Sequence, residues 1–276
     1  MPKIFVNDIN IHYQRIGQGP DVVMIHGIAS NLALWLNIQR ALAEEFRVTT
    51  YDLRGHGYSD MPPSGYNSAD MAADLNALLD HLGIERTHLV GHSFGGLVAL
   101  HYTVLYPNRV DRLILADTGI PAVENSRKSN PVFEEWQERL KNFGVSIPDD
   151  KQDDVDYLLI QTRKVRESFL SPKAKRRKMG VLPSIERLSR LIKTTSILDD
   201  FRSTAGLTLD KICRIRHQLF ICYGERSPST VSRQYLQENL PNCTSAIVPN
   251  AGHFHLLTQP EMFMKKVNEF LLSKQL

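Results

Sequence analysis

A G-x-S-x-G sequence constrains the fold of this chain more than any other feature. It occupies residues 91–95, directly after the apolar pair Leu89 and Val90 and directly before a helical segment at residues 97–106. A serine on such a sharp strand-to-helix turn projects its hydroxyl above the edge of a sheet, and small neighbours let the chain pack closely around the turn. Ser93 is therefore a candidate nucleophile. The alternative is a glycine-rich turn in which this serine only caps the helix.

Strand and helix patterns alternate through the first half of the chain. Residues 9–15 alternate between apolar and polar side chains, as an antiparallel strand does, whereas residues 22–25 are continuously apolar, as in a parallel strand buried on both faces. Further strands are expected at residues 48–51, 88–90, 113–116, 219–223 and 246–248, and helices at residues 71–82 and 261–272. This pattern predicts an α/β fold with a mostly parallel sheet.

The alternation stops between residues 122 and 210, where the sequence is helical and heavily charged. The net charge of the chain is +3, and the excess of basic residues lies in this segment. Strands before and after one helical block indicate an insertion over the carboxyl edge of the sheet, where ligands bind in open α/β folds. We therefore expect a core domain at residues 1–121 and 211–276, with a helical cap at residues 122–210 inserted after the strand that ends at Asp117.

Composition limits the classes of function that need to be considered. A net charge of +3 is too small to indicate nucleic-acid binding by the whole molecule. Cys213, Cys222 and Cys243 are odd in number and lack metal-ligand spacing, so neither a disulfide framework nor structural zinc is expected. The N-terminus lacks a signal-peptide pattern, and no apolar run is long enough to span a bilayer. We expect a cytoplasmic protein without a membrane span.

Four sequence motifs follow one another along the chain. They are residues 24–28 (MIHGI), residues 51–60 (YDLRGHGYSD), the turn around Ser93 and residues 250–254 (NAGHF). In these motifs the chain resembles the α/β-hydrolase family, specifically its branch of small capped esterases, enol-lactonases and dehalogenase-like proteins with a serine nucleophile. The resemblance covers nearly the whole chain. It implies an α/β-hydrolase fold, with a mostly parallel sheet flanked by helices and covered by a helical cap.

The resemblance also assigns catalytic roles to residues in these motifs. His253 matches the family's base, which would remove the proton of Ser93 during attack and return it to the leaving group. The backbone amides of Ile28 and Phe94 match the family's oxyanion hole, which stabilises the charge developing on a carbonyl oxygen. The alternative for Ile28 and Phe94 is that they only line the pocket. His253 and His255 form a His-x-His pair without a third ligand, so we expect no metal and no cofactor.

The acid of a catalytic triad is missing from its usual place. In most relatives an aspartate follows the late strand, here residues 220–223, but this chain has Ser227 at that position, and serine cannot carry the charge. One alternative is Asp117, at the end of an earlier strand where some dehalogenase-like relatives carry their acid. A second is Glu225, which is close in sequence. The third is that the acid is absent and the protein is a weakened hydrolase; we favour Asp117.

A basic run lies within the expected cap. Its basic residues are Lys173, Lys175, Arg176, Arg177 and Lys178. Such a run indicates either a solvated surface or a docking patch for an acidic carrier protein or the phosphates of coenzyme A. We favour the solvated surface, because runs of charge usually only interact with water. No nucleic-acid recognition motif accompanies the run.

Together these residues predict a serine hydrolase. We expect it to cleave a small or acyl-chain ester, thioester or lactone through an acyl-enzyme, and a dehalogenase is excluded because residue 93 is not an aspartate. The same site would also serve an acyltransferase or a hydrolase of carbon–carbon bonds. From another class, the alternative is a catalytically weak ligand-binding or scaffold protein, because a fold does not determine a function.

Overall fold

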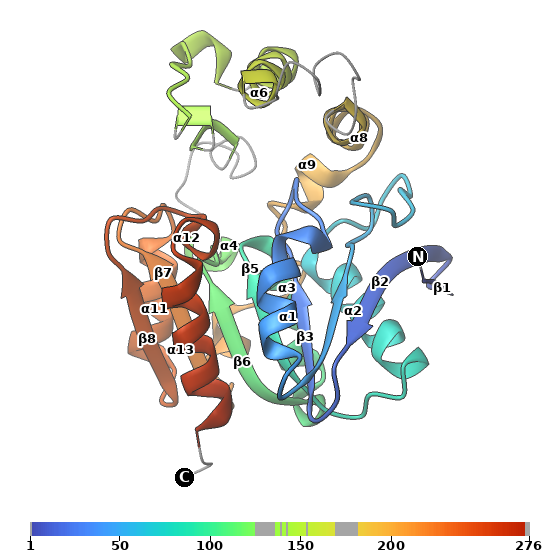
Figure 1. The fold of residues 1–276 in the computed structure, drawn as a ribbon, viewed down its shortest axis with the longest axis vertical. Helices are drawn as coiled ribbons and strands as arrows, with labels where there is room; N and C mark the ends of the chain where they lie inside the picture. Colours follow the sequence, from blue (N-terminus) through green and yellow to red (C-terminus); the bar gives the residue numbers. More distant parts are fainter. Residues whose placement is uncertain are drawn as a thin grey trace.

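An eight-stranded sheet lies at the centre of the computed structural model, in the strand order β1-β2-β4-β3-β5-β6-β7-β8 (Figure 1). The structure describes residues 2–124, 136–138, 140–141, 143–152, 154–168 and 182–273. The strands are β1 (Lys3–Val6), β2 (Ile9–Ile16), β3 (Asp21–Ile25), β4 (Arg47–Tyr51), β5 (Thr87–His92), β6 (Val110–Ala116), β7 (Gln218–Gly224) and β8 (Cys243–Val248). The β1–β2 and β2–β4 pairs are antiparallel and all other pairs are parallel. The predicted mostly parallel α/β fold is confirmed.

Helices cover both faces of this sheet. Along β3, Val23 and Ile25 contribute to one apolar core, and Val22 and Met24 contribute to the other. The first core is covered by α2 (Ser68–His81), α3 (Phe94–Leu105) and α11 (Thr230–Asn239), and the second by α1 (Leu36–Leu42) and α13 (Pro260–Leu272). Burial on both faces explains why the central strands are continuously apolar, as predicted from their sequence.

Short helical segments complete the part that packs around the sheet. They are η1 (Leu32–Trp35), η2 (Pro107–Arg109), α4 (Pro121–Glu124), α10 (Leu209–Ile212) and α12 (His255–Thr258). Pro107 opens η2 and Pro260 opens α13, where the missing amide of proline costs no helical hydrogen bond. These segments turn the chain back toward the next strand or helix.

Four of the described helical segments between β6 and β7 lie toward one end of the sheet. They are η3 (Asp149–Lys151), α6 (Val155–Ser168), α8 (Leu182–Thr194) and α9 (Ile197–Asp200); we call α6, α8 and α9 the inserted helices. Figure 1 shows the inserted helices above one end of the sheet. A small apolar cluster joins α6 and α8 to the residues before them; its members are Trp136, Leu140, Ile147, Leu158 and Ile192. The basic run at residues 173–178 falls outside the described residues.

Candidate active site

Ser93 lies on a strained turn between β5 and α3. Its φ of 55° and ψ of −125° fall in a sparsely populated region for a residue with a side chain, which is typical of functional sites. The turn needs glycine on both sides: a Cβ on Gly91 would lie 2.4 Å from the carbonyl oxygen of Gly95, and a Cβ on Gly95 would lie 2.3 Å from that of Ile25. The flanking glycines therefore allow a sharp turn at Ser93, whose backbone is neither strand nor helix.

Asp117 occupies the matching position on the neighbouring strand. In the register of β5 and β6, His92 pairs with Ala116, so Ser93 and Asp117 are each the first residue after adjacent parallel strands. The amide of Ser93 donates to the carbonyl oxygen of Ala116 at 2.9 Å, and that of Asp117 donates to Cys222 at 2.9 Å. Asp117 also has a positive φ, of 50°. Both side chains consequently leave the sheet at the same edge.

The carboxylate of Asp117 is fully buried and receives three hydrogen bonds. Its Oδ1 accepts from Nδ1 of His253 at 2.8 Å and from Oγ of Ser227 at 2.6 Å, while its Oδ2 accepts from the amide of Gly224 at 2.9 Å. Hydrogen bonds to an ionised acceptor are short and strong, and they offset the cost of burying the charge. Ser227, at the usual place of the acid, thus supports the carboxylate of Asp117.

His253 is presented by the loop that follows β8. Because its Nδ1 faces Asp117, we assign the proton to Nδ1, which leaves the lone pair of a general base on Nε2. Nε2 of His92, the residue next to Ser93, contacts the backbone oxygen of His253 at 3.0 Å, and the two imidazole rings lie 4.7 Å apart. His92 therefore anchors the loop of His253 beside Ser93, a role that its sequence position alone did not indicate.

Glu225, the other candidate acid, points elsewhere. Its side chain is exposed, and its Oε2 accepts a hydrogen bond from the amide of Asn250 at 2.7 Å. The carboxylate that the structure brings to the imidazole of His253 is that of Asp117.

The two candidate oxyanion-hole residues lie close to Ser93 along the chain or in space. A Cβ on Gly27 would lie 2.9 Å from Cβ of Ser93, so the peptide leading to Ile28 packs directly against the serine. Phe94 is the first residue of α3, where helix amides have no intrahelical partner and point toward negative charge. Both side chains are buried.

Two buried histidines hold the loops around Ile28. Nδ1 of His26 contacts the oxygen of Gly27 at 2.7 Å, and its Nε2 accepts from the amide of Leu53 at 3.1 Å. Nε2 of His56 accepts from the amide of Ala29 at 3.1 Å. Burial lowers the pKa of His26, and burial, with the neighbouring His26, lowers the pKa of His56 to about 3. Both rings are therefore neutral near pH 7, when each can donate one hydrogen bond and accept another.

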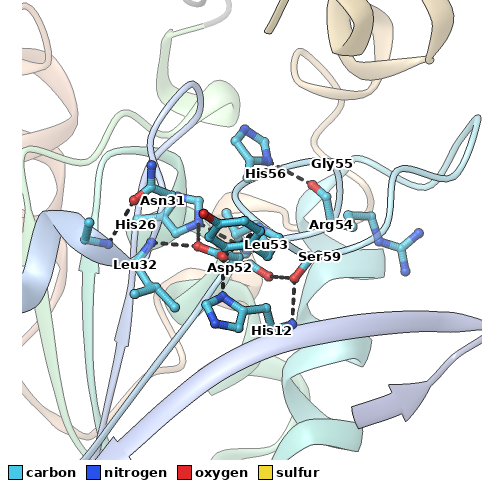
Figure 2. Close-up of polar contacts among 12 residues, drawn as sticks. His12, His26, Asn31, Leu32, Asp52, Leu53, Arg54, Gly55, His56 and Ser59 are labelled. Carbon is cyan, nitrogen blue, oxygen red and sulfur yellow. Dashed lines mark hydrogen bonds and ion pairs between the residues drawn. The ribbon is translucent and has the colours of Figure 1, made fainter. Parts of the chain in front are cut away.

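A second buried histidine–aspartate pair connects β2 to these loops, as Figure 2 shows. Nδ1 of His12 and Oδ2 of Asp52 are 2.7 Å apart, and the amide of Leu32 donates to Oδ1 at 2.8 Å. Burial alone would raise the pKa of Asp52, but His26, the amides of Leu32 and Tyr58, and His12 bring it below its usual value. The hydroxyl of Ser59 donates to the backbone oxygen of Asp52 at 2.6 Å and accepts from the amide of His12 at 3.0 Å.

The segment between β6 and β7 touches both sides of the Ser93 site. The ring of Phe201 stacks on Phe94 with 4.7 Å between centroids. Oε1 of Glu138 lies 3.5 Å from the amide of His253. On α8, Nε of Arg187 donates to the carbonyl oxygen of Gly55 at 3.0 Å, in the loop that holds His56.

Two negative findings concern the described ranges only. Within them, no three histidine, cysteine, aspartate or glutamate side chains are grouped as a metal site would require. Among the helices in the same ranges, none combines the length and the apolar character needed to cross a bilayer.

Comparison with curated proteins gives relatives of two kinds. An uncharacterized protein of Mycobacterium tuberculosis is 45% identical over 107 residues, which are 39% of this chain and 31% of that protein. This chain therefore spans about a third of the length of that relative. The pimeloyl-[acyl-carrier protein] methyl ester esterase of Chromobacterium violaceum is 28% identical over 270 residues, which cover 95% of this chain and 98% of that one.

Solved structures and a family model agree with the observed fold. The enol-lactonase of Burkholderia xenovorans LB400 superposes with a TM-score of 0.71 at 21% sequence identity, covering 99% of this chain and all of that one. The model of the alpha/beta hydrolase fold matches residues 20–260, a range that includes Ser93, Asp117 and His253. With that match over most of its length, the chain belongs to the α/β-hydrolase family.

Proposed function

We propose that this hydrolase cleaves a small or acyl-chain ester, thioester or lactone through an acyl-enzyme on Ser93. The observation that carries the proposal is the buried 2.8 Å contact between Nδ1 of His253 and Oδ1 of Asp117, at the end of the strand next to that of Ser93. A neutral imidazole oriented by a carboxylate is what a serine needs to become a nucleophile at neutral pH. The names of the esterase and enol-lactonase relatives support the substrate class.

The proposed reaction has two halves. Oγ of Ser93 attacks the substrate carbonyl while Nε2 of His253 accepts the hydroxyl proton, and the amides of Ile28 and Phe94 donate to the resulting oxyanion. The intermediate then expels the alcohol, thiol or ring oxygen, which takes the proton from His253. In the second half, water attacks the acyl-enzyme, gives a proton to His253, and Ser93 leaves with that proton.

Asp117 is the acid of this proposed triad. Its carboxylate stabilises the imidazolium that forms on His253 and keeps the ring in the tautomer whose Nε2 accepts a proton. Ser227 donates to the same carboxylate oxygen as His253, Oδ1, and the amide of Gly224 donates to the other oxygen, Oδ2. Ser227 stands where most relatives carry the acid, and here it donates a hydrogen bond to the proposed acid, Asp117.

Residues 122–210 are the proposed cap over this site. The stacking of Phe201 on Phe94 supports this assignment, because it brings the inserted segment to the residue directly after Ser93. The described contacts of Glu138 and Arg187 reach the loops of the proposed base and oxyanion hole. We expect the cap to select substrates by shape.

Labelling with a fluorophosphonate tests the proposal. The wild-type protein should be modified once, and peptide mapping should place the adduct on Ser93, while Ser93→Ala should stay unmodified. A panel of short and long acyl esters, thioesters and lactones would then rank the substrate class. An unreactive wild-type protein with a native thermal unfolding curve would contradict the proposal and favour the ligand-binding or scaffold alternative.

A carrier-linked acyl substrate is a narrower version of the proposal. It is favoured by one observation, that a relative of similar length is named for an acyl-carrier-protein ester. Changing Lys175, Arg176 and Arg177 to Glu should then raise KM for carrier-linked or coenzyme A esters and leave small free esters unaffected. Equal effects on both classes of ester, or no effect on either, would support the interpretation that the basic run is only a solvated surface.

A further inference from the structure

We propose that His255 is a positioning residue that adjusts how strongly Asp117 stabilises a proton on His253. This inference rests on the function proposed above. The side chain of His255 is fully buried, and its Nδ1 lies 3.6 Å from Oδ2 of Asp117, on the opposite oxygen from the one that contacts His253. Two imidazoles, two residues apart in sequence, therefore face one carboxylate.

The distance decides what kind of contact this is. At 3.6 Å the His255 nitrogen is too far from Oδ2 to make a hydrogen bond, and Gly224 already donates to that oxygen at 2.9 Å. A backbone hydrogen bond with His253 also acts on the ring of His255 and raises its pKa, against the larger effect of burial. The edge-on contact of this ring with Phe263, at 5.5 Å between centroids, holds the ring in place.

The charge state of His255 suits this role. Burial lowers the pKa of His255 to about 4, although Asp117 acts in the opposite direction. The ring is therefore neutral near pH 7 and does not compete with His253 as the counter-ion of Asp117. We assign its proton to Nδ1, because a lone pair facing a carboxylate would be repelled. The positive end of the ring dipole then points at Oδ2, where it stabilises the carboxylate and disfavours a second positive charge on His253.

Other titratable groups lie near His253 or near Asp117. They are His92, whose ring lies beside His253, Glu138 from the inserted segment, and Cys222 and Tyr223 on β7. Burial, with a smaller contribution from Asp117, raises the pKa of Cys222 to about 12 and raises that of Tyr223, so both are neutral. The imidazole that faces Oδ2 of Asp117 is that of His255, whereas His253 faces Oδ1.

Two variants separate the dipole of His255 from its volume. His255→Phe keeps an aromatic ring against Phe263 and removes the donor, whereas His255→Asn keeps an amide donor near the position of Nδ1 and cannot titrate. The measurement is the second-order rate of fluorophosphonate labelling of Ser93 between pH 4.5 and 9, whose acid limb reports deprotonation of His253. Thermal unfolding at each pH checks that the variants are folded.

The proposal predicts opposite results for the two variants. His255→Phe should move the midpoint of the acid limb upward by about half a pH unit, because the dipole no longer opposes the proton on His253. His255→Asn should keep the wild-type midpoint. A wild-type midpoint in folded His255→Phe would overturn the proposal, and so would a shifted midpoint in His255→Asn. If the Phe variant does not fold, the midpoint of His255→Asn alone tests the proposal. If wild-type Ser93 does not react at all, the proposed function fails instead.

Discussion

A buried histidine–aspartate pair occurs beside Ser93 and again in the loop network of Figure 2, and the two pairs are nearly identical in length. His253 and Asp117 are 2.8 Å apart, and His12 and Asp52 are 2.7 Å apart. A serine is near each pair. The difference lies in the backbone at the serine, and it separates a candidate catalytic group from a structural one.

Ser59 uses its hydroxyl to hold the chain together. The hydroxyl donates to the backbone oxygen of Asp52 and accepts from the backbone amide of His12, so it links β2 to the loop after β4. Ser93 instead stands on a turn of unfavourable φ and ψ. Such strain persists only where the surrounding structure enforces it, and it is common at functional sites. A serine, a histidine and an aspartate close together therefore do not by themselves make a triad.

Replacing each serine by alanine should give the largest difference between the two regions. Ser93→Ala should lower ester turnover by at least about 10³-fold, because the nucleophile is lost while little volume is removed. Ser59→Ala should keep the turnover per folded molecule and lower the free energy of unfolding by about 1–3 kcal/mol, because two buried backbone groups lose their partner. Steady-state assays and urea unfolding measure the two effects. Wild-type turnover in Ser93→Ala would refute the mechanism.

Replacing His253 or His12 should show the same contrast between catalysis and stability. His253→Ala should lower turnover nearly as much as Ser93→Ala. The double variant should resemble either single one, because losses of activity from residues of one catalytic unit are not additive. His12→Ala should instead destabilise the fold, since it leaves the buried carboxylate of Asp52 with one partner fewer. Additive losses from Ser93 and His253 would argue against a shared proton transfer.

Acid should destabilise both regions through their neutral histidines. The pKa of His56 is about 3 and that of His255 about 4 in the folded protein, mainly because of burial, against a usual value of 6.5. The unfolded chain therefore binds protons first as the pH falls below 6.5, so the stability present above 6.5 is progressively lost, by about 2 kcal/mol per group between pH 7.5 and 5.

Variants of these histidines test that dependence. His56→Gln and His255→Asn should each flatten the fall of the urea midpoint between pH 7.5 and 5 by a similar amount, one from each region. A replacement of the exposed His81 is the matched control and should leave the slope unchanged. An unaltered slope in both test variants would show that other groups cause the acid sensitivity.

Ser227→Ala should have the smallest effect on catalysis. It removes one of the hydrogen bonds to Asp117 and leaves those from His253 and Gly224 in place. We expect a loss of about tenfold or less in kcat, equivalent to about one hydrogen bond. A loss as large as that of His253→Ala would mean that Ser227 has a direct part in the reaction.

The fold was predictable because its signals are local. The apolar runs located the central strands to within a few residues, but β6 begins at Val110 and β8 at Cys243, each three residues before the expected start. Asp111 and Arg112 hid the start of β6, although the guanidinium of Arg112 is buried against the carbonyl oxygen of Leu271 at the end of α13. Polar residues hid the start of β8 because it is an edge strand with exposed side chains.

The candidate site was predictable only in part, for the same physical reason. The motif around Ser93 and the position of His253 can be recognised from neighbouring residues. The roles of Ser227, His92 and His255 depend on distances between segments that are far apart in sequence, such as the 2.6 Å contact between Ser227 and Asp117. No local pattern distinguishes a serine that replaces an acid from one that supports it.

The rate of fluorophosphonate labelling of Ser93 in acid-site variants tests whether Asp117 is the acid of the triad. Asp117→Asn removes the charge at nearly constant size and also favours the wrong imidazole tautomer, so labelling should slow by about 10²-fold to 10⁴-fold. Glu225→Gln and Asp52→Asn, compared per folded molecule, should label at nearly the wild-type rate. Slow labelling of Glu225→Gln with rapid labelling of Asp117→Asn would contradict the account.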